Sequence, residues 1–266
     1  MRRVWIASIS CALAVAASLL LARVHPFGDA GLYAAKSAQA PIMEHSSASP
    51  EVRAALVAKC ADCHSMQTRS PFYGRFAPVS WLMERDIIEG RKKMNLSLWD
   101  THSADQRQIL KAKIVQETKT HEMPLPQYRM IHWNAKITDA DIQSFTQWAR
   151  EMPVVALGPP VQPAGEGDPI RGKTIFEMRC TGCHAMAHDL EGPRLQGVYG
   201  RTSGDVAGFD YSSALKKAHI VWNDTSLEQW LADPDTLVPC NNMQFHVARP
   251  QERLDLIAFL KQGARK

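Results

Sequence analysis

Apolar residues recur at every third or fourth position along most of this chain, which is the spacing of one face of an α-helix. The segment that starts at Pro50 places Val52, Leu56 and Val57 in this way. Further helical segments run over 79–93, 103–119, 138–152, 168–180 and 249–262. Alternating apolar and polar runs of strand length are scarce, so the pattern predicts an all-α fold.

Polar residues that cap helices precede several of these segments. Ser103 stands at the start of one, and Ser80 is a candidate cap of another. Thr138 and Asp141 lie three residues apart, which resembles a capping box. The sequence therefore predicts the starts of these helices as well as their existence.

Two stretches interrupt the helical pattern. Residues 24–49 are mostly small and polar and are interpreted as a tether, and residues 152–169 contain five prolines and three glycines. We therefore divide the chain into a leader at 1–23, the tether, a domain at 50–151, a linker at 152–166 and a second domain at 167–266.

The leader has the form of an export signal, with Arg2 and Arg3 followed by an uncharged stretch from residue 4 to residue 22. It can act as a membrane anchor or be cleaved, and a small-x-small pattern at 38–40 lies far beyond the apolar run. Cys11 lies too early for a lipoprotein cysteine. In either case the domains are expected in the periplasm or on the outer face of the cytoplasmic membrane.

Composition limits both the class of protein and its possible partners. The chain of 266 residues is 45% hydrophobic and 22% charged, which is typical of a globular protein. The formal net charge is only +4, and no basic stripe is interleaved with aromatic residues. Nucleic acid is therefore not an expected partner.

Four of the six cysteines form two CxxCH motifs, Cys60-Ala-Asp-Cys63-His64 and Cys180-Thr-Gly-Cys183-His184. Two cysteines three apart at a helix end can bond both vinyl groups of one haem, and the following histidine can bind its iron. A thioredoxin-like redox pair needs an α/β pattern, and 116 residues between the motifs exceed common zinc-ribbon spacings. Structural disulfides are the remaining alternative. Two covalently attached haem c groups are the prediction.

Each haem iron needs a sixth ligand or an open site. Met123 and Met243 both lie in proline-containing loops downstream of a CxxCH motif, and methionine opposite histidine closes an iron to small ligands. The alternative for any methionine is core packing. His121 and His246 are the competing ligand candidates.

From about residue 167 to residue 262 the chain closely resembles the class I, mitochondrial-type cytochrome c family. The resemblance rests on "GKTIFEMRCTGCH", "GPRLQGVYGR", "GFDYSSALKKAHIVW", "LEQWLADP", the P-x-x-x-M that ends at Met243, and "ERLDLIAFLK". It implies that Gly172 and Phe176 pack against Leu256 and Phe259 where the terminal helices cross.

The same resemblance assigns residues around the haem. It implies that the Pro193 carbonyl accepts a hydrogen bond from His184. It also implies that Arg201, Tyr211 and Trp222 hydrogen-bond the haem propionates, with ordinary core packing as the alternative for Tyr211 and Trp222.

Residues 50–151 resemble a second family, the small haem-binding domain of exported bacterial proteins. The resemblance rests on "CADCHS", "PFYGRFAPVSWLMERDIIEGRKKMNLSLW", the Met-Pro at 123–124 and "ADIQSFTQWA". It maps the family's CxxCH and methionine onto Cys60, Cys63, His64 and Met123, and its usual membrane segment favours an anchor. The two resemblances together imply two cytochrome c-like helical haem domains in tandem, joined by a Pro/Gly-rich linker.

Cys240 departs from the cytochrome c pattern, which has glycine immediately after the proline of the methionine loop. If this position needs a positive φ, a Cβ costs on the order of 1 kcal/mol. Cys240 is interpreted as a tolerated substitution, as a thiol that forms a mixed or intermolecular disulfide, or as a competing axial ligand. The three alternatives stay open at this point.

We expect an electron carrier that exchanges single electrons with a redox protein donor and acceptor, both unidentified, and does no bond chemistry of its own. The alternatives are a dihaem peroxidase or sulfur-compound dehydrogenase, a haem-based sensor, or an electron-delivery subunit of a larger dehydrogenase. A peroxidase needs an iron without a permanent sixth ligand. Whether the methionines bind the irons therefore decides between an electron carrier and a peroxidase.

Overall fold

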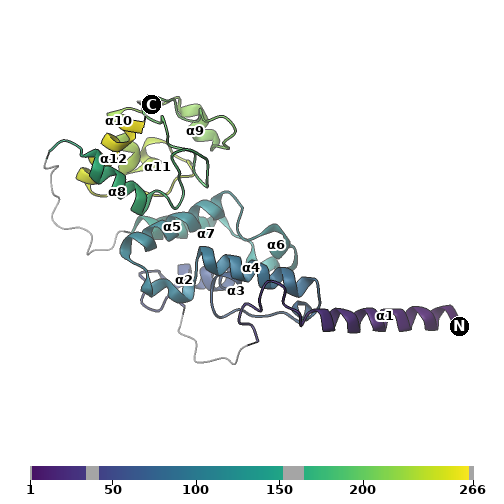
Figure 1. The fold of residues 1–266 in the computed structure, drawn as a ribbon. Coiled ribbons are helices and arrows are strands. Elements are labelled where there is room, and N and C mark those ends of the chain that lie inside the picture. The colour runs from purple at the N-terminus through teal and green to yellow at the C-terminus, as the bar shows by residue number, and fades with distance from the viewer. Residues whose placement is uncertain (1, 34–41, 152–164, 264–266) are drawn as a thin grey trace. The chain divides into compact units, whose positions relative to one another are not determined.

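The computed structural model describes residues 2–33, 42–151 and 165–263 (Figure 1). The described residues form helices joined by turns, with no strand beyond one isolated bridge between Thr202 and Val221. The predicted all-α fold is confirmed. Most of the predicted linker, residues 152–164, lies outside the described residues.

By compactness the chain divides into two units. The first holds residues 1–101 with 127–137, and the second holds 102–126 with 138–266. The helices of residues 104–119 and 139–150 pack on each other and are grouped with the second unit. The domain boundaries derived from the sequence stay a prediction. No helix in the described ranges combines the length and apolar character that crossing a bilayer requires.

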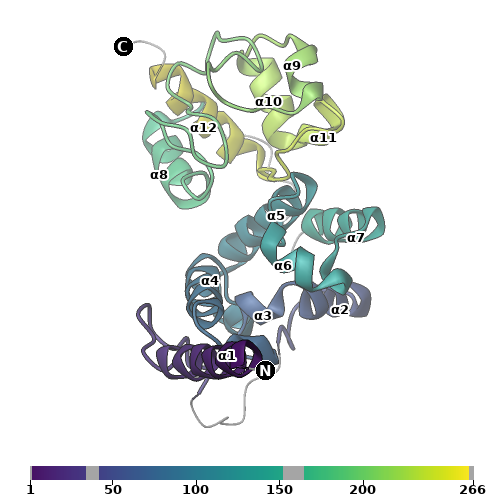
Figure 2. The same cartoon turned by 90° about the vertical axis from the view of Figure 1, so that its right-hand side faces the viewer.

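The first unit is built around a very short helix that carries one CxxCH motif. Figure 2 shows this helix, α3, between α2 and α4. The helices of this unit are α1 (Arg2–Leu21), α2 (Pro50–Lys59), α3 (Ala61–His64), η1 (Phe72–Arg75), α4 (Val79–Lys93), η2 (Leu96–Thr101), α6 (Pro126–Ile131) and η3 (Trp133–Ala135).

Local sequence explains where α2 and α4 begin. The Ser49 side chain accepts from the Val52 amide, and Pro50 fills the first turn of α2. The prediction that Ser80 caps α4 is wrong. This helix begins at Val79, directly after Pro78, and Ser80 is buried inside its first turn.

Part of the predicted tether packs onto the first unit. Ile42, Met43 and Ala48 are buried, and Met43 is only 1% exposed. Their apolar side chains explain the difference, since burying them removes hydrocarbon surface from water. Residues 34–41 of the tether lie outside the described part of the chain.

The second unit contains α5 (Ala104–Lys119), α7 (Asp139–Arg150), α8 (Pro169–Arg179), α9 (Ser213–Ala218), α10 (Asp224–Ala232), α11 (Pro234–Leu237) and α12 (Pro250–Gly263). Two predicted helix starts are confirmed here. Ser103 and Gln106 form a capping box at α5, and Thr138 and Asp141 form one at α7.

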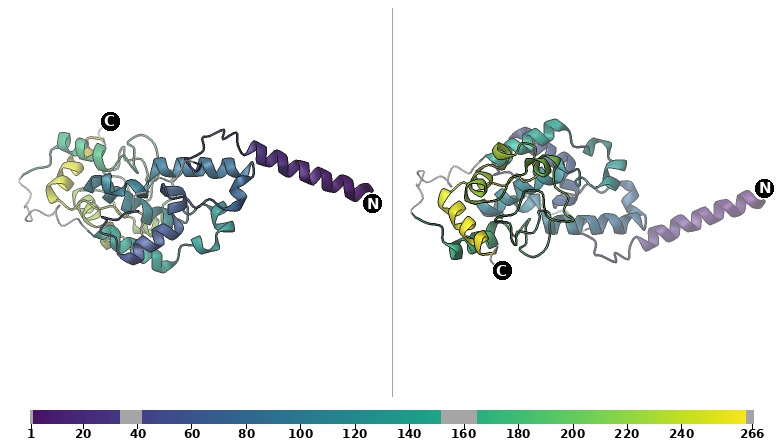
Figure 3. Two further views of the ribbon diagram at one scale, coloured as in Figure 1. Left: turned by 90° about the horizontal axis from the view of Figure 1, so that it is seen from below. Right: turned by 90° about the horizontal axis from the view of Figure 1, so that it is seen from above.

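Helices α8 and α12 pack against each other at very close range (Figures 1 and 3). A Cβ on Gly172 would lie 1.9 Å from the carbonyl oxygen of Asp255 and 2.9 Å from the Cβ of Phe259. The rings of Phe176 and Phe259 pack beside this point with centroids 5.4 Å apart. The absent side chain of Gly172 therefore sets how closely the two helices approach.

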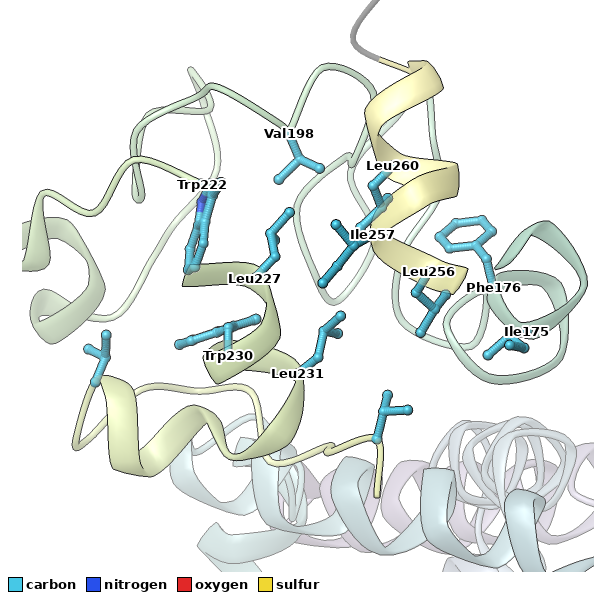
Figure 4. Close-up of a cluster of buried hydrophobic side chains, with 12 residues drawn as sticks. Ile175, Phe176, Val198, Trp222, Leu227, Trp230, Leu231, Leu256, Ile257 and Leu260 are labelled. Atoms are coloured by element: carbon cyan, nitrogen blue, oxygen red, sulfur yellow. The ribbon is translucent and has the colours of Figure 1, made fainter. Parts of the chain in front are cut away.

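Inward of this crossing lies an apolar core that α10 completes (Figure 4). Its buried members include Trp222 and Trp230, whose rings are tilted by 58° to each other with centroids 5.3 Å apart. The remaining members are Ile175, Phe176, Val198, Leu227, Leu231, Val238, Val247, Leu256, Ile257 and Leu260.

A buried carboxylate fixes the start of α8 to α12. Asp255 accepts from the Arg171 guanidinium, with Nε–Oδ2 and Nη2–Oδ1 distances of 2.9 Å, and from the Asp168 amide at 2.8 Å. Burial disfavours the ionised form of Asp255, but these donors outweigh it, and the pKa is lowered from 3.8. The ionised carboxylate thus stabilises the crossing.

We expect Asp255→Asn to lower the free energy of unfolding by about 1.5–3 kcal/mol, because charge-assisted hydrogen bonds are lost and one amide N–H faces a donor. Since folding lowers this pKa, the contribution is present above pH 3.8 and is lost as pH falls through the folded-state value. Urea titrations at pH 7 and at pH 3 measure this. A stability gap between the two proteins that is as large at pH 3 as at pH 7 would contradict the role of the charge.

Candidate haem sites

Both CxxCH motifs form the same tight turn at the end of a helix. The first cysteine caps the preceding helix, and its carbonyl accepts from the amides of the second cysteine and of the histidine. The bonds to Cys60 O measure 3.3 and 2.9 Å, and those to Cys180 O measure 3.0 and 2.8 Å. One helical turn therefore brings two thiols and one imidazole to one side of each motif.

Each imidazole is oriented by a backbone carbonyl. Nδ1 of His184 lies 2.8 Å from Pro193 O, in the position that the cytochrome c resemblance implies. Nδ1 of His64 lies 3.1 Å from Met94 O, a partner that the sequence did not indicate. With Nδ1 engaged, each ring has Nε2 left for a metal ion.

The protonation state suits metal binding as well. Burial lowers the pKa of His64 and of His184 from 6.5, and the bonds to Met94 O and Pro193 O offset this only in part. Both rings are therefore neutral at pH 7, which is the form that binds iron.

Burial shifts the pKa of these cysteine thiols upward, whereas a redox-active pair needs a lowered pKa. It raises the pKa of Cys63 and of Cys183 to about 11, and that of Cys180 to about 12. Redox-active CxxC pairs depend on a lowered pKa. Partly buried thiols beside an oriented neutral imidazole fit a covalently held haem, and thioether bonds would place the porphyrin against these side chains.

Two glycines allow the chain to pass directly over these motifs. A Cβ on Gly192 would lie 2.3 Å from Cε1 of His184 and 2.6 Å from its Nδ1. A Cβ on Gly90, in α4, would lie 2.9 Å from the carbonyl oxygen of Cys63. Neither contact was predicted, because the sequence does not show which glycine covers an imidazole.

We expect Gly192→Ala to displace the His184 ring or the loop that holds it, since a contact at 2.3 Å cannot be accommodated. Resonance Raman or paramagnetic NMR of the ferric protein measures the change at that haem alone. Gly197→Ala is the control, because a Cβ at Gly197 meets nothing within 4 Å although its φ of 68° strains it. Equal spectra for both variants would contradict the close contact.

The loop of Met243 is shaped by Asn241. This side chain is 1% exposed, donates to Asp235 Oδ1 and Val238 O at 2.9 Å, and accepts from the Met243 amide at 2.7 Å. The Met243 sulfur lies 3.1 Å from Nε1 of Trp230, at the edge of the core cluster. The loop that carries the predicted ligand is thus fixed by three hydrogen bonds of one buried side chain.

Cys240 lies in this loop with a φ of 65°, so the positive φ anticipated there is confirmed. The residue is exposed at the surface. Asn241 imposes the backbone shape on Cys240, which therefore bears the strain that glycine would avoid. An exposed thiol is accessible for a disulfide, while its axial-ligand alternative stays a prediction.

Met123 lies in the loop after α5, where its amide donates to Glu117 O at 3.1 Å. It is partly buried, and it follows His121, whose φ is 61°. His64 belongs to the other compact unit, so their pairing stays a prediction. The competing candidate His246 is partly buried, and burial lowers its pKa from 6.5.

Backbone bonds and electrostatic interactions connect Arg201, Tyr211 and Trp222, the proposed propionate ligands. The Arg201 guanidinium donates to Arg194 O at 3.0 Å and to Gln196 O at 3.2 Å, and the Trp222 amide donates to Arg201 O at 2.9 Å. Burial lowers the pKa of Arg201 and raises that of Tyr211, and the two groups interact electrostatically. Trp222 is also a core residue, so its packing role is present in the structure.

Comparison with known proteins agrees with this geometry. Residues 19–151 match the family described as "Haem-binding domain", and residues 170–264 match the family described as "Cytochrome c". Cytochrome c of Chlamydomonas reinhardtii is 43% identical over 104 residues, which are 38% of this chain and 93% of that protein. Cytochrome c of Euglena viridis is 47% identical over 98 residues, 36% of this chain and 96% of that protein.

Among solved structures, cytochrome cH from Methylobacterium extorquens is 39% identical and overlaps 36% of this chain and 99% of its own, with a TM-score of 0.35. The two regions that match families, residues 19–151 and 170–264, each contain one of the two CxxCH turns.

Proposed function

This chain belongs to the haem-binding domain family over residues 19–151 and to the cytochrome c family over residues 170–264, and on that premise we propose that it is an exported dihaem electron carrier. Two haem c groups follow from the two domains, as the sequence predicted. When bound, each haem supplies a reversible one-electron couple.

The observation that carries the proposal is the repeated CxxCH turn with an oriented, neutral imidazole. His64 and His184 each offer Nε2 on one side, and Met123 and Met243 are the proposed ligands on the other. Two protein ligands on each iron leave no coordination position for a substrate, which favours electron transfer over bond chemistry.

The proposed location is outside the cytoplasm, on the evidence of the leader sequence. Residues 4–22 are proposed to attach the protein to the outer face of the cytoplasmic membrane unless the leader is cleaved. In the described part of α1, apolar side chains on different faces of the helix are exposed, such as Ile6, Ile9 and Val15. This exposure supports a lipid environment for the segment.

A dihaem peroxidase or a sulfur-compound dehydrogenase is the second candidate. The sequence feature that would favour it is Cys240, whose exposed thiol lies three residues from Met243. A thiolate in place of methionine would change the chemistry of that iron. The cytochrome c relatives named above favour a carrier.

The first experiment is a haem count by pyridine haemochrome, followed by the oxidised spectrum in the red. Methionine bound to ferric haem gives a weak charge-transfer band there. Two haems per chain, with a band intensity that matches two methionine-ligated irons, would support the carrier. A band that matches one iron or none would overturn the simple carrier and direct tests to peroxide and thiosulfate as substrates.

A further inference from the structure

An unbroken series of side-chain contacts leads from the first CxxCH motif toward the surface of its unit. Asp62, between Cys60 and Cys63, accepts from the Tyr128 hydroxyl at 2.8 Å. The other oxygen of Asp62 accepts from Arg69 Nε at 2.9 Å, which neutralises the carboxylate. Tyr128, on α6, is therefore fixed to the motif itself.

From Tyr128 the contacts continue to η1. The ring of Tyr128 packs on the ring of His132 with centroids 3.9 Å apart. Nε2 of His132 lies 2.7 Å from the Tyr73 hydroxyl, and burial raises the pKa of both tyrosines. The series Asp62, Tyr128, His132 and Tyr73 thus joins the motif to η1 and η3.

Beside the outer end of this series lies a group of exposed apolar side chains, called here the aromatic patch. Phe72 is 77% exposed, Met130 is 78% exposed and Trp133 is 84% exposed, and Ile131 completes the patch. The bond between Tyr73 and His132 brings Phe72 next to residues 130–133, since each partner is adjacent in sequence to patch residues. Several large exposed side chains together indicate an interaction surface.

The two chain segments that carry the aromatic patch contain charged residues of one sign. Residues 66–83 and 123–138, which contain the patch and its surroundings, include Arg69, Arg75, Arg129 and Lys136 and no aspartate or glutamate. Arg75 and Lys136 are exposed. The whole domain from 50 to 152 is more balanced, with 15 Lys/Arg and 12 Asp/Glu. Arg69 is paired with Asp62, so the excess positive charge of these two segments comes from Arg75, Arg129 and Lys136.

We propose that the aromatic patch is the docking surface for an acidic one-electron redox protein, and that the Asp62–Tyr128–His132–Tyr73 series connects it to the N-terminal haem. An apolar centre with a charged rim is the usual anatomy of a specific interface, and complementary charge accelerates encounter. One electron leaves the partner and reduces one ferric haem to the ferrous state, and no proton or bond is exchanged. This proposal rests on the proposed function.

Binding tests the surface without any haem readout. The probe is oxidised flavodoxin, a small acidic flavoprotein, titrated into the full-length holo-protein by calorimetry with hydrogen–deuterium exchange. We expect residues 70–77 and 127–136 to gain protection, and the double variant Arg75→Glu/Lys136→Glu to weaken binding by about tenfold or more. Lys173→Glu, which changes an exposed charge on α8, is the matched control and should change binding less than about twofold.

Two outcomes would overturn the proposal that the aromatic patch is the docking surface. One is protection elsewhere, with equal effects of the double variant and of Lys173→Glu. The other is protection of the two segments by phosphatidylglycerol vesicles but not by flavodoxin, which would assign the patch to a membrane. Absence of the red charge-transfer band together with intact flavodoxin binding would overturn the proposed function but not the proposed docking surface.

The connection to the haem has its own test. Tyr128→Phe keeps the ring contact with His132 and removes only the hydroxyl bond to Asp62. We expect unchanged affinity for flavodoxin and a several-fold slower electron transfer within the complex, measured by laser flash photolysis of the flavin. An unchanged rate would overturn the role of the series, and a changed affinity would assign Tyr128 to the shape of the surface.

Discussion

Met243→Leu is expected to remove half of the red charge-transfer band, Met123→Leu the other half, and the double variant the whole band. Leucine conserves most of the volume of methionine, so packing around the loop changes little. It has no sulfur, so, with Met243 as the proposed ligand, the iron bound by His184 would lose its sixth ligand and become accessible to small ligands. Cyanide or imidazole binding, followed by absorbance, should become fast at one haem in each single variant.

Met178→Leu is the matched control, since this methionine on α8 is 58% exposed. Its spectrum should equal that of the parent protein. If Met123→Leu leaves the band intact, the ligand of the N-terminal haem is another residue, and His121 is the next to replace. If Met243→Leu leaves it intact, His246 and Cys240 are replaced in turn.

Gly172→Ala is expected to lower the free energy of unfolding of the cytochrome c domain by about 3 kcal/mol or more. The added methyl would meet backbone, the Asp255 carbonyl at 1.9 Å, and backbone cannot rotate aside as a side chain can. The two helices must separate, which also disturbs the Phe176 and Phe259 contact. Denaturant unfolding followed by haem absorbance measures the loss.

Gly165→Ala is the control, because a Cβ at Gly165 meets nothing within 4 Å. It should change the stability by no more than about 0.5 kcal/mol. A Gly172→Ala protein as stable as the Gly165→Ala protein would show that α8 and α12 do not cross as closely as described.

Features encoded by neighbouring residues could be predicted from the sequence. The capping boxes at Ser103 and Thr138 confirm this, because a cap involves residues only three apart. The CxxCH turns are equally local. The Gly172 crossing and the positive φ of Cys240 could be anticipated only because a family resemblance supplied the expected packing.

What the sequence did not indicate depends on chain segments that meet across long separations. Met94 orients His64 through its backbone carbonyl, which any residue type provides, so no side-chain pattern marks it. Gly90 and Gly192 are needed only because a motif passes beneath them. Ser80 looked like a cap because its residue type favours that position, but Pro78 fixes the start of α4.

The two imidazoles are held by carbonyls at unequal sequence separations, and this has a consequence for the order in which the two sites lose their structure. Pro193 lies nine positions after His184 in the sequence, whereas Met94 lies thirty positions after His64. The carbonyl of Met94 directly follows α4, so it stays in place only while α4 remains packed on α3. The N-terminal haem should therefore lose its ligand orientation first in mild denaturant, so that one protein contains an early and a late reporter of unfolding.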